Sequence, residues 1–86
     1  MGGQLSDMWF VYVLKSLKDG KYYIGSTSDL KKRILQHNRG SNTSTKHRRP
    51  LELVYSGTYN TEEEAVAREF QIKRYKGGQA FKKLIK

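Results

Sequence analysis

Apolar residues along the chain gather in three short segments that have the pattern of β-strands. Residues 8–15 (MWFVYVLK) are apolar at nearly every position, which predicts a strand buried on both faces and therefore central in its sheet. Asp19 and Gly20 form a turn signal, and residues 22–27 (YYIGST) follow it as a second strand, so the two are expected to form a hairpin. The third strand is predicted at residues 51–59 (LELVYSGTY).

Three further segments have the pattern of helices, and the first of them follows the hairpin. It covers residues 29–38 (DLKKRILQHN), and either Ser28 or Thr27 is able to cap it. A polar, basic loop at residues 39–50 then leads to the third strand. Loops of about a dozen residues without structure are usually functional or mobile.

The other two helices lie in the C-terminal third of the chain. Thr61 and Glu64 have the spacing of a capping box at the start of residues 61–78, and the glycine pair that ends this segment is a stop signal. Residues 80–86 (AFKKLIK) predict a short terminal helix. Its inward-facing apolar residues are expected to be Phe81, Leu84 and Ile85. The order β-β-α-β-α-α predicts an α/β fold of the α+β type, with a small three-stranded antiparallel sheet flanked by three helices.

Length and composition narrow the class of protein. The 86 residues suffice for one domain with a modest core, which we place at residues 8–86. Residues 1–7 are small and polar, and we expect them to be a disordered lead or an expression remnant. The chain has no cysteine, which excludes disulfides and thiolate metal sites and fits a cytoplasmic protein. No apolar run is long enough to span a membrane, so no membrane partner is expected.

The net charge of +9 predicts an anionic partner, most often a nucleic acid. Residues 31–49 carry seven Lys or Arg and residues 70–86 carry six, with no acid in either range. Five of the eight acids lie between Glu52 and Glu69. Such segregation is what a phosphate-binding face requires, although a basic protein without such a partner is the alternative.

Two tyrosines, Tyr12 and Tyr23, are predicted to lie on the same face of the hairpin. A two-residue turn at Asp19–Gly20 would separate them by about 13 Å along the strands, whereas a six-residue loop would place them directly opposite each other. Both registers put the two phenols on one side of the sheet. They are either half-buried packing residues, as strand propensity alone would favour, or a pair assembled for chemistry.

The first helix carries polar residues on and beside its apolar face. At about 100° per residue, Leu30, Ile34 and His37 share one narrow arc, and Arg33 lies at its edge. An arginine in this position either extends past the core to solvent or points into a cleft. A lone histidine on such a face is more often structural than catalytic.

Glu69 is predicted to lie inside the apolar arc of the second helix. The residues that define this arc are Ala65, Val66, Phe70 and Ile72. A carboxylate placed there needs a cation, a metal ion or water. A salt bridge to Arg33 or Lys73 and a functional role are both open, whereas the acids at residues 62–64 need only the helix dipole.

Taken together, these residues resemble the GIY-YIG nuclease domain. Its first motif corresponds to VYV at residues 11–13, and its second is present as YIG at residues 23–25. The segment LKKRILQHNRG is similar to the family's helix and places its arginine at Arg33 and its histidine or tyrosine at His37. AVAREFQIK is similar to the family's metal-binding segment, with Glu69 as the acid. The resemblance covers nearly the whole chain and is greatest to small stand-alone members related to the nuclease domain of bacterial excision repair.

The resemblance implies a metal-dependent endonuclease that hydrolyses phosphodiester bonds in DNA, in repair or recombination. Glu69 would hold one divalent ion, Mg²⁺ or Mn²⁺, and Arg33 would bind the scissile phosphate. Tyr12 would take a proton from the attacking water, which requires nearby positive charge to favour its phenolate. His37 would relay that proton or anchor a phosphate, and Tyr23 would orient the water.

Backbone and surface positions complete the predicted site. Gly25 would let the backbone approach a ligand closely or begin the helix without a clash. Ser26 stands where some family members carry a lysine, so that lysine's role is not transferred to it. The residues expected to contact phosphates are Arg39, Lys46, His47, Arg48, Arg49, Lys73, Lys82 and Lys83.

Two other functions are compatible with the same sequence. A nucleic-acid-binding module would keep the fold but lack turnover, and a small RNA- or ribosome-associated basic protein would need only the charge. For the nuclease, the expected partner is DNA, including structured or branched DNA, while RNA is not excluded. A protein partner is expected to supply specificity, because the chain offers little surface beyond the core.

Overall fold

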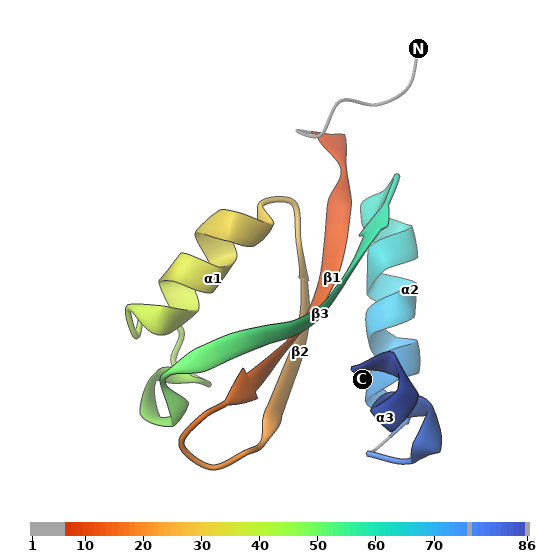
Figure 1. Ribbon diagram of the computed structural model, residues 1–86. Helices are drawn as coiled ribbons and strands as arrows, with labels where there is room; N and C mark the ends of the chain where they lie inside the picture. The colour runs from red at the N-terminus through yellow and green to blue at the C-terminus, as the bar shows by residue number, and fades with distance from the viewer. Residues whose placement is uncertain (1–6, 76, 86) are drawn as a thin grey trace.

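The computed structural model describes residues 7–75 and 77–85 (Figure 1). The predicted lead at residues 1–7 therefore lies outside the described residues, apart from Asp7. The strands and helices follow in the order β1 (Trp9–Ser16), β2 (Tyr22–Thr27), α1 (Leu30–Asn38), β3 (Leu51–Tyr59), α2 (Glu62–Lys73) and α3 (Gln79–Leu84). The predicted fold class and element order are confirmed.

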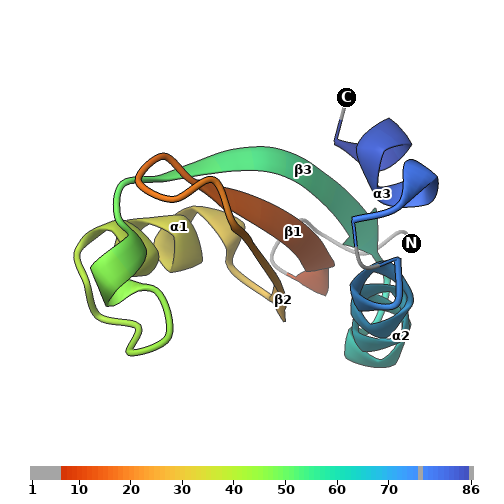
Figure 2. The same cartoon turned by 90° about the horizontal axis from the view of Figure 1, so that it is seen from below.

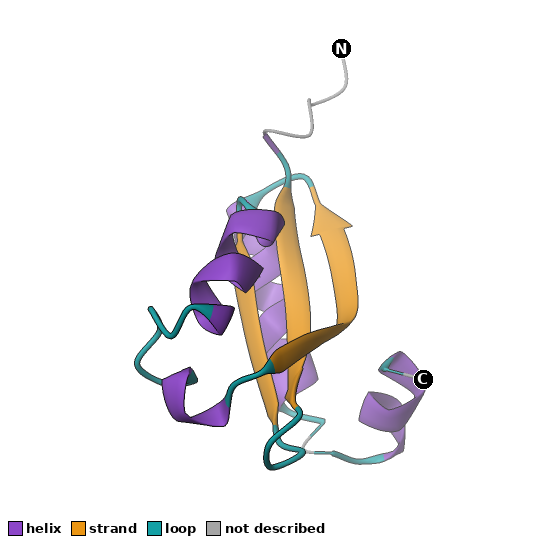
Figure 3. Cartoon of the chain, turned by 60° about the vertical axis from the view of Figure 1, so that its left-hand side comes forward, coloured by secondary structure: helices purple, strands orange, loops and turns teal. Residues whose placement is uncertain are grey.

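The three strands form one antiparallel sheet in the order β2-β1-β3, so the apolar strand β1 is central as predicted. Helix α1 covers one face, and α2 and α3 cover the other (Figures 1 and 2). Because side chains alternate along β1, Val11 and Val13 pack toward α2 and α3, whereas Tyr12 and Leu14 pack toward α1. Figure 3 shows the sheet lying between α1 and α2. Helix α1 and strand β1 thus enclose Tyr12.

The register of the hairpin differs from both predicted ones. Tyr12 lies opposite Gly25 and Leu14 lies opposite Tyr23, so each prediction was wrong by one two-residue step, although the shared face was right. Five residues, 17–21, connect the strands, and the turn is closed by hydrogen bonds from the Ser16 N–H to the Lys21 carbonyl and from the Gly20 N–H to the Ser16 carbonyl. Gly20 adopts a φ of 75°, which favours glycine.

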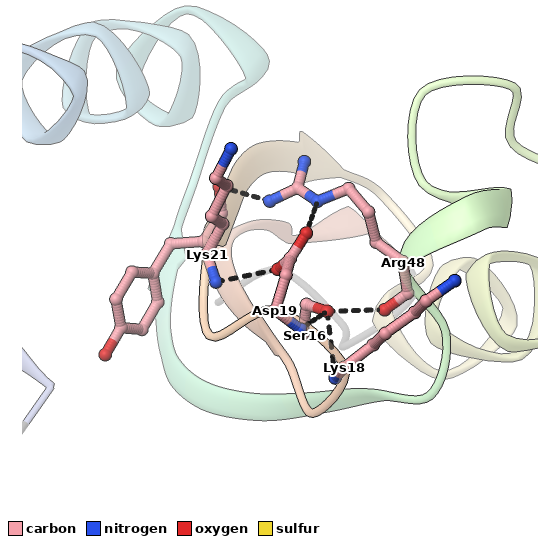
Figure 4. Close-up of polar contacts among 6 residues, drawn as sticks. Ser16, Lys18, Asp19, Lys21 and Arg48 are labelled. Atoms are coloured by element: carbon pink, nitrogen blue, oxygen red, sulfur yellow. Dashed lines mark hydrogen bonds and ion pairs between the residues drawn. The ribbon is translucent and has the colours of Figure 1, made fainter.

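A cluster of polar contacts around Ser16 sets this register (Figure 4). The Ser16 hydroxyl oxygen accepts hydrogen bonds from the backbone N–H groups of Lys18 and Asp19 and donates to the carbonyl of Arg48 at 2.7 Å. The Arg48 guanidinium donates to the carbonyl of Tyr22 and lies 3.5 Å from the Asp19 carboxylate. The turn is therefore fastened to a segment some thirty residues later, which sequence periodicity cannot reveal.

The loop predicted at residues 39–50 contains one turn of 3₁₀ helix, η2 (Lys46–Arg48), so it is partly structured. Helix α1 is capped by Asp29, whose carboxylate accepts from the backbone of Lys32 at 3.0 Å. The prediction of Ser28 or Thr27 as the cap was wrong. Thr27 instead accepts from the backbone N–H of Asp29.

Helix α2 begins as predicted, since the Thr61 side chain accepts from the backbone of Glu64. It ends at Lys73, before the glycine pair that was expected to stop it. Phe70 was expected in its apolar arc, but its side chain is 59% exposed. Five residues of helix turn through about 140°, which carries Phe70 away from the face of Ala65 that meets the sheet.

Candidate active site

A chain of three buried polar side chains lies on the α1 face of the sheet. The Tyr12 hydroxyl on β1 is 3.1 Å from Nε2 of His37 on α1, and Nδ1 of His37 is 2.8 Å from Oγ1 of Thr45 in the following loop. All three residues are fully buried. The prediction that His37 faces the core is therefore confirmed. Thr45 was missed, because neither periodicity nor a motif marks a threonine within a polar loop.

Tyr23 joins this group from the edge strand β2. Its ring centroid lies 6.3 Å from that of Tyr12 and 4.9 Å from that of His37, and the Tyr12 and His37 centroids are 5.8 Å apart. Tyr23 is half-buried, whereas Tyr12 has no exposed surface. The two phenols therefore share one face, and only Tyr23 meets solvent.

Gly25 makes room for the Tyr12 phenol. A Cβ at this position would lie 2.6 Å from the Tyr12 hydroxyl oxygen and 2.8 Å from its Cζ. Real Cβ atoms do not approach so closely, and the Tyr12 ring is fully buried, where close packing resists its displacement. The sequence argued for a glycine that admits a ligand or starts a helix, and the structure adds this packing requirement.

Gly25→Ala is therefore expected to lower the free energy of unfolding by about 1–3 kcal/mol through overpacking against Tyr12. Gly57→Ala on β3 is the comparison variant, because its Cβ would meet the hydroxyl of Tyr55 at 2.8 Å and the ring edge of Tyr59 at 3.3 Å. Both of these rings are only half-buried and so have more room to adjust than the fully buried Tyr12. Urea unfolding of both variants measures the difference. Equal stability of the two variants would contradict this account of Gly25.

The environment of Tyr12 holds its hydroxyl in the protonated form. Burial raises the pKa of Tyr12 to about 12, with Tyr23 adding to the rise, while the guanidinium of Arg33 opposes it and the charge of Glu69 adds to it slightly. Arg33 does favour the phenolate, as the sequence suggested, but burial outweighs it. The isolated protein therefore presents a phenol rather than a phenolate at neutral pH.

His37 is held in its neutral form. Burial lowers the pKa of His37, and the nearby Arg33 guanidinium lowers it further. The other ionisable groups facing the imidazole are the phenols of Tyr12 and Tyr23. A neutral ring leaves one nitrogen able to accept a hydrogen bond in the core.

This burial predicts a pH-dependent stability. Because the pKa of His37 is lower in the folded than in the unfolded chain, the unfolded chain takes up a proton that the native site excludes as pH falls below the ordinary value of 6.5. The free energy of unfolding should fall between pH 7.5 and pH 5.5 in the wild-type protein and in His47→Gln, where an exposed histidine is removed. It should fall less in His37→Gln. Equal losses in the two variants, measured by urea unfolding, would show that His37 is not the group responsible.

Glu69 approaches from the opposite face of the sheet. Ser26 on β2 lies opposite Val11 and therefore points toward α2, where its hydroxyl donates to one Glu69 carboxylate oxygen at 2.8 Å. The other oxygen lies 2.7 Å from the ammonium of Lys73, one of the two pairings expected from the sequence. Glu69 is thus separated from Tyr12 by the edge strand, yet its charge is near enough to contribute to the raised pKa of that phenol.

Ser26, to which the sequence analysis assigns no role, is the hydrogen-bond partner of Glu69. What indicates this contact is the pairing register of β2 with β1. A serine next to Gly25, on the face that β2 turns toward the apolar side of α2, needs a polar partner on that helix. This signal becomes readable only once the pairing of Ser26 with Val11 is known.

The Glu69 carboxylate is a suitable ligand for a single hard cation. Its side chain is 15% exposed, and it already receives one cationic group, the Lys73 ammonium. Within residues 7–75 and 77–85, no group of three or more His, Cys, Asp or Glu could enclose a metal ion. A divalent ion held here would therefore keep most of its water ligands, as Mg²⁺ commonly does.

The half-buried Arg33 lines a small pocket of about 170 Å³ at the start of α1. The other residues around this pocket are Thr27, Ser28, Asp29, Lys32 and Gln36. Lys32 and Arg33 give the pocket two cations, while the Asp29 carboxylate, which accepts from the backbone of Lys32, adds one negative charge. Arg33 connects this pocket with the buried phenol, because its guanidinium also lowers the pKa of Tyr12.

The predicted phosphate-binding residues do not form one continuous surface. A larger pocket of about 640 Å³ lies between the β1–β2 turn and the end of α1, lined by Lys18, Asn38, Lys46, His47, Arg49 and Pro50. The exposed Arg39 directly follows α1, whereas Lys82 and Lys83 belong to α3, on the other side of the sheet (Figure 1).

Three cations of the predicted set are engaged within the protein. Arg48 contacts the Asp19 carboxylate and the Tyr22 carbonyl, and Lys73 pairs with Glu69. Arg49 donates from Nε to the carbonyl of Lys46 at 2.8 Å. In the part of the chain that the structure describes, no helix is both long and apolar enough to cross a membrane.

Comparison with known proteins gives one family. A family model described as the GIY-YIG catalytic domain matches residues 8–82. The chain is 46% identical to the UPF0213 protein SERP0126 of Staphylococcus epidermidis over 77 residues, which cover 88% of this chain and 93% of the relative. It is 43% identical to the UPF0213 protein SSP2268 of Staphylococcus saprophyticus over 70 residues, covering 80% and 84%. The solution NMR structure of the UPF0213 protein BH0048 from Bacillus halodurans has a TM-score of 0.48 and 35% identity, covering 78% of this chain and 71% of that chain.

Proposed function

Because the chain belongs to the GIY-YIG catalytic domain family, a family of nucleases, we propose that it is a metal-dependent endonuclease that hydrolyses phosphodiester bonds in DNA. The observation that carries this proposal is the contact of the Tyr12 hydroxyl with Nε2 of a neutral, buried His37 beside Arg33. This contact places an oxygen that can pass on a proton next to a nitrogen that can accept it.

Tyr12 and His37 act in this proposal as a proton relay. Because the Tyr12 hydroxyl is buried in the free protein, the relay requires that substrate binding admit the attacking water to it. That water gives a proton to the Tyr12 oxygen while the phenol gives its own proton to Nε2 of His37, which becomes an imidazolium. The oxygen of the water bonds to phosphorus, the bond to the leaving oxygen breaks, and that oxygen takes a proton from solvent. A phenol with a pKa of about 12 is a poor source of phenolate, so the relay lets the better-matched imidazole receive the proton.

Arg33 binds the scissile phosphate through its guanidinium and offsets the negative charge that grows on the phosphoryl oxygens. Its place beside the small pocket at the start of α1 supports this role. Tyr23, half-buried at the edge strand, orients the attacking water from the solvent side. Gly25 keeps the Tyr12 phenol in position between them.

Glu69 would hold the divalent ion, Mg²⁺ or Mn²⁺, with Ser26 fixing the carboxylate through its hydrogen bond. When bound, such an ion stabilises charge on the phosphoryl group and on the leaving oxygen. The Lys73 ammonium that now contacts Glu69 would give up its place to the ion and turn toward a phosphate. Lys73 therefore keeps the phosphate-binding role that its sequence position suggested.

The test is direct incubation of the protein with single-stranded, duplex and flap DNA, with Mg²⁺ or Mn²⁺ and with a chelator. Cleavage is expected only with the metal ion, and structured DNA of the kind formed in repair or recombination is the expected preferred substrate. Cleavage in the presence of the chelator would overturn the proposal. RNA of the same sequences serves as the comparison substrate, and addition of cell extract asks whether a protein partner supplies specificity.

A non-catalytic nucleic-acid-binding module is the second candidate. It is favoured by the full engagement of Glu69, since both carboxylate oxygens already have partners within the chain. The cationic pocket beside η2 would then be the main binding surface. This candidate predicts DNA binding that weakens steeply with salt and leaves the DNA intact under every metal condition. Binding that does not change when the salt concentration rises severalfold would exclude it.

A further inference from the structure

Thr45 has a contact that its place in a polar loop does not explain. Its side chain is fully buried, and Oγ1 lies 2.8 Å from Nδ1 of His37, eight residues earlier. Threonine in a loop of this kind usually faces solvent. Here it closes the far end of the Tyr12–His37 contact, which makes a continuous buried chain of hydroxyl, imidazole and phenol.

The backbone around Thr45 is fixed on both sides. Its N–H donates to the carbonyl of Asn42 at 3.1 Å, and its own carbonyl accepts from the N–H of Arg48 at 2.9 Å. The carbonyl of Arg48 is in turn held by the hydroxyl of Ser16 on β1. The Thr45 hydroxyl is therefore presented to His37 by a turn that is itself fastened to the central strand.

The hydrogen bonds of the imidazole can run in two directions. In one, Nδ1–H donates to Thr45 and Nε2 accepts from the Tyr12 hydroxyl, while in the other both bonds are reversed. The Tyr12 hydroxyl is buried and needs an acceptor for its own proton, and Nε2 lies 3.1 Å away. The Arg33 guanidinium, which lowers the pKa of Tyr12 and can only donate, also favours a phenol proton directed toward Nε2. Both points favour the first arrangement.

We propose that Thr45 is a positioning residue that accepts the Nδ1–H of His37 and so keeps Nε2 free to take the proton of Tyr12. This inference deepens the proposed function and rests on it, because the relay matters only if the protein cleaves phosphodiesters. Thr45 touches neither the expected substrate nor the metal ligand Glu69. It acts on the reaction only through the tautomer and orientation of His37.

The position of Thr45 in the chain gives this role a second consequence. It directly precedes η2, whose residues line the cationic pocket beside the end of α1. A nucleic acid held in that pocket would contact the same turn that presents the Thr45 hydroxyl. The same turn thus carries both the Thr45 hydroxyl and residues that line the cationic pocket.

The first experiment measures the tautomer in the wild-type protein without DNA or metal. The ¹⁵N resonances of the two His37 ring nitrogens are recorded by NMR at neutral pH, with His47→Gln used to assign them. A protonated Nδ1 and a bare Nε2 are the expected result. The opposite tautomer would overturn the proposal, whether or not the protein is a nuclease.

The second experiment uses Thr45→Val, which keeps the shape of the side chain but removes the hydroxyl, and Thr45→Ser, which keeps the hydroxyl. In Thr45→Val we expect the tautomer population to shift toward Nε2–H and kcat to fall by roughly 10- to 100-fold, with KM little changed. Thr45→Ser should keep the tautomer and most of the rate. An unchanged tautomer and rate in Thr45→Val would overturn the positioning role.

The two readouts separate this inference from the proposed function. If wild-type protein cleaves no DNA, the endonuclease proposal fails, and the tautomer measurement still decides whether Thr45 fixes His37. If it cleaves DNA and Thr45→Val does so equally well, only the positioning role fails. The tautomer measurement also separates positioning from folding. A purely structural defect in Thr45→Val would lower its stability without changing the tautomer of the folded fraction, and Thr45→Ser shows whether any substitution at this position affects folding.

Discussion

Replacing Glu69 with glutamine is expected to lower the rate of metal-dependent DNA cleavage by on the order of 10²–10³-fold, without loss of the fold. Glutamine has the same shape, and its amide oxygen can still accept the hydrogen bond of Ser26. It removes the charge that would attract a divalent ion. The Lys73 ammonium is left unpaired but is 47% exposed, so its loss of a partner costs little stability.

The matched control for this variant is Glu63→Gln. Glu63 lies in the first turn of the same helix, is exposed and takes no part in the site, so its rate should equal that of the wild-type protein. Cleavage is measured with rising Mg²⁺ and Mn²⁺ concentrations for the three proteins. Undiminished cutting by Glu69→Gln, or by the more disruptive Glu69→Ala, would remove Glu69 from the mechanism.

The fold was predictable because its main signals are local. The continuous apolar run of β1 predicted a central strand, and the alternation of side chains put Tyr12 and Tyr23 on one face whichever even register was chosen. The exact pairing was not predictable. It depends on the hydroxyl of Ser16, which is bonded to a carbonyl thirty-two residues away, and no periodicity encodes that contact.

The centre of the candidate site was predictable for a similar reason. The helical arc that turns His37 toward the core is a property of nine consecutive residues, and the structure places that ring against Tyr12. Its outer partners were not predictable. Ser26 reaches Glu69 across forty-three residues, and Thr45 reaches His37 from a loop whose composition alone predicts solvent exposure.

Charge counts were the least reliable guide to the site. They placed Arg48 with the phosphate-binding residues, yet its guanidinium fastens the β1–β2 turn through Tyr22 and Asp19. They also assigned Lys82 and Lys83 of α3 to the same phosphate-binding set as the basic loop, although α3 and that loop lie on opposite sides of the sheet (Figure 1). Net charge predicts the sign of a partner, whereas the sheet decides which charges can reach it together.

Replacing Tyr12 with phenylalanine is expected to lower the cleavage rate by roughly 10²–10⁴-fold, because it removes the oxygen that passes the proton from water to His37. The ring would keep its contacts with Tyr23 and His37. Nε2 of His37 would lose its buried partner, so the free energy of unfolding should fall by about 1–3 kcal/mol.

Tyr22→Phe is the control for this loss of a hydroxyl, since Tyr22 lies next to Tyr23 on β2 but packs against Phe81 on the opposite face.

The dependence of the cleavage rate on pH then separates the relay from a structural defect. Burial lowers the pKa of His37, so the wild-type rate should hold through neutral pH and past the ordinary value of 6.5. It should fall only at more acidic pH, where the imidazole becomes protonated and can no longer accept from Tyr12. The residual rate of Tyr12→Phe should lack this fall. A Tyr12→Phe protein that cuts DNA within a few-fold of the wild-type rate, with the same acidic limb, would show that the buried phenol is a packing residue and that another group activates the water.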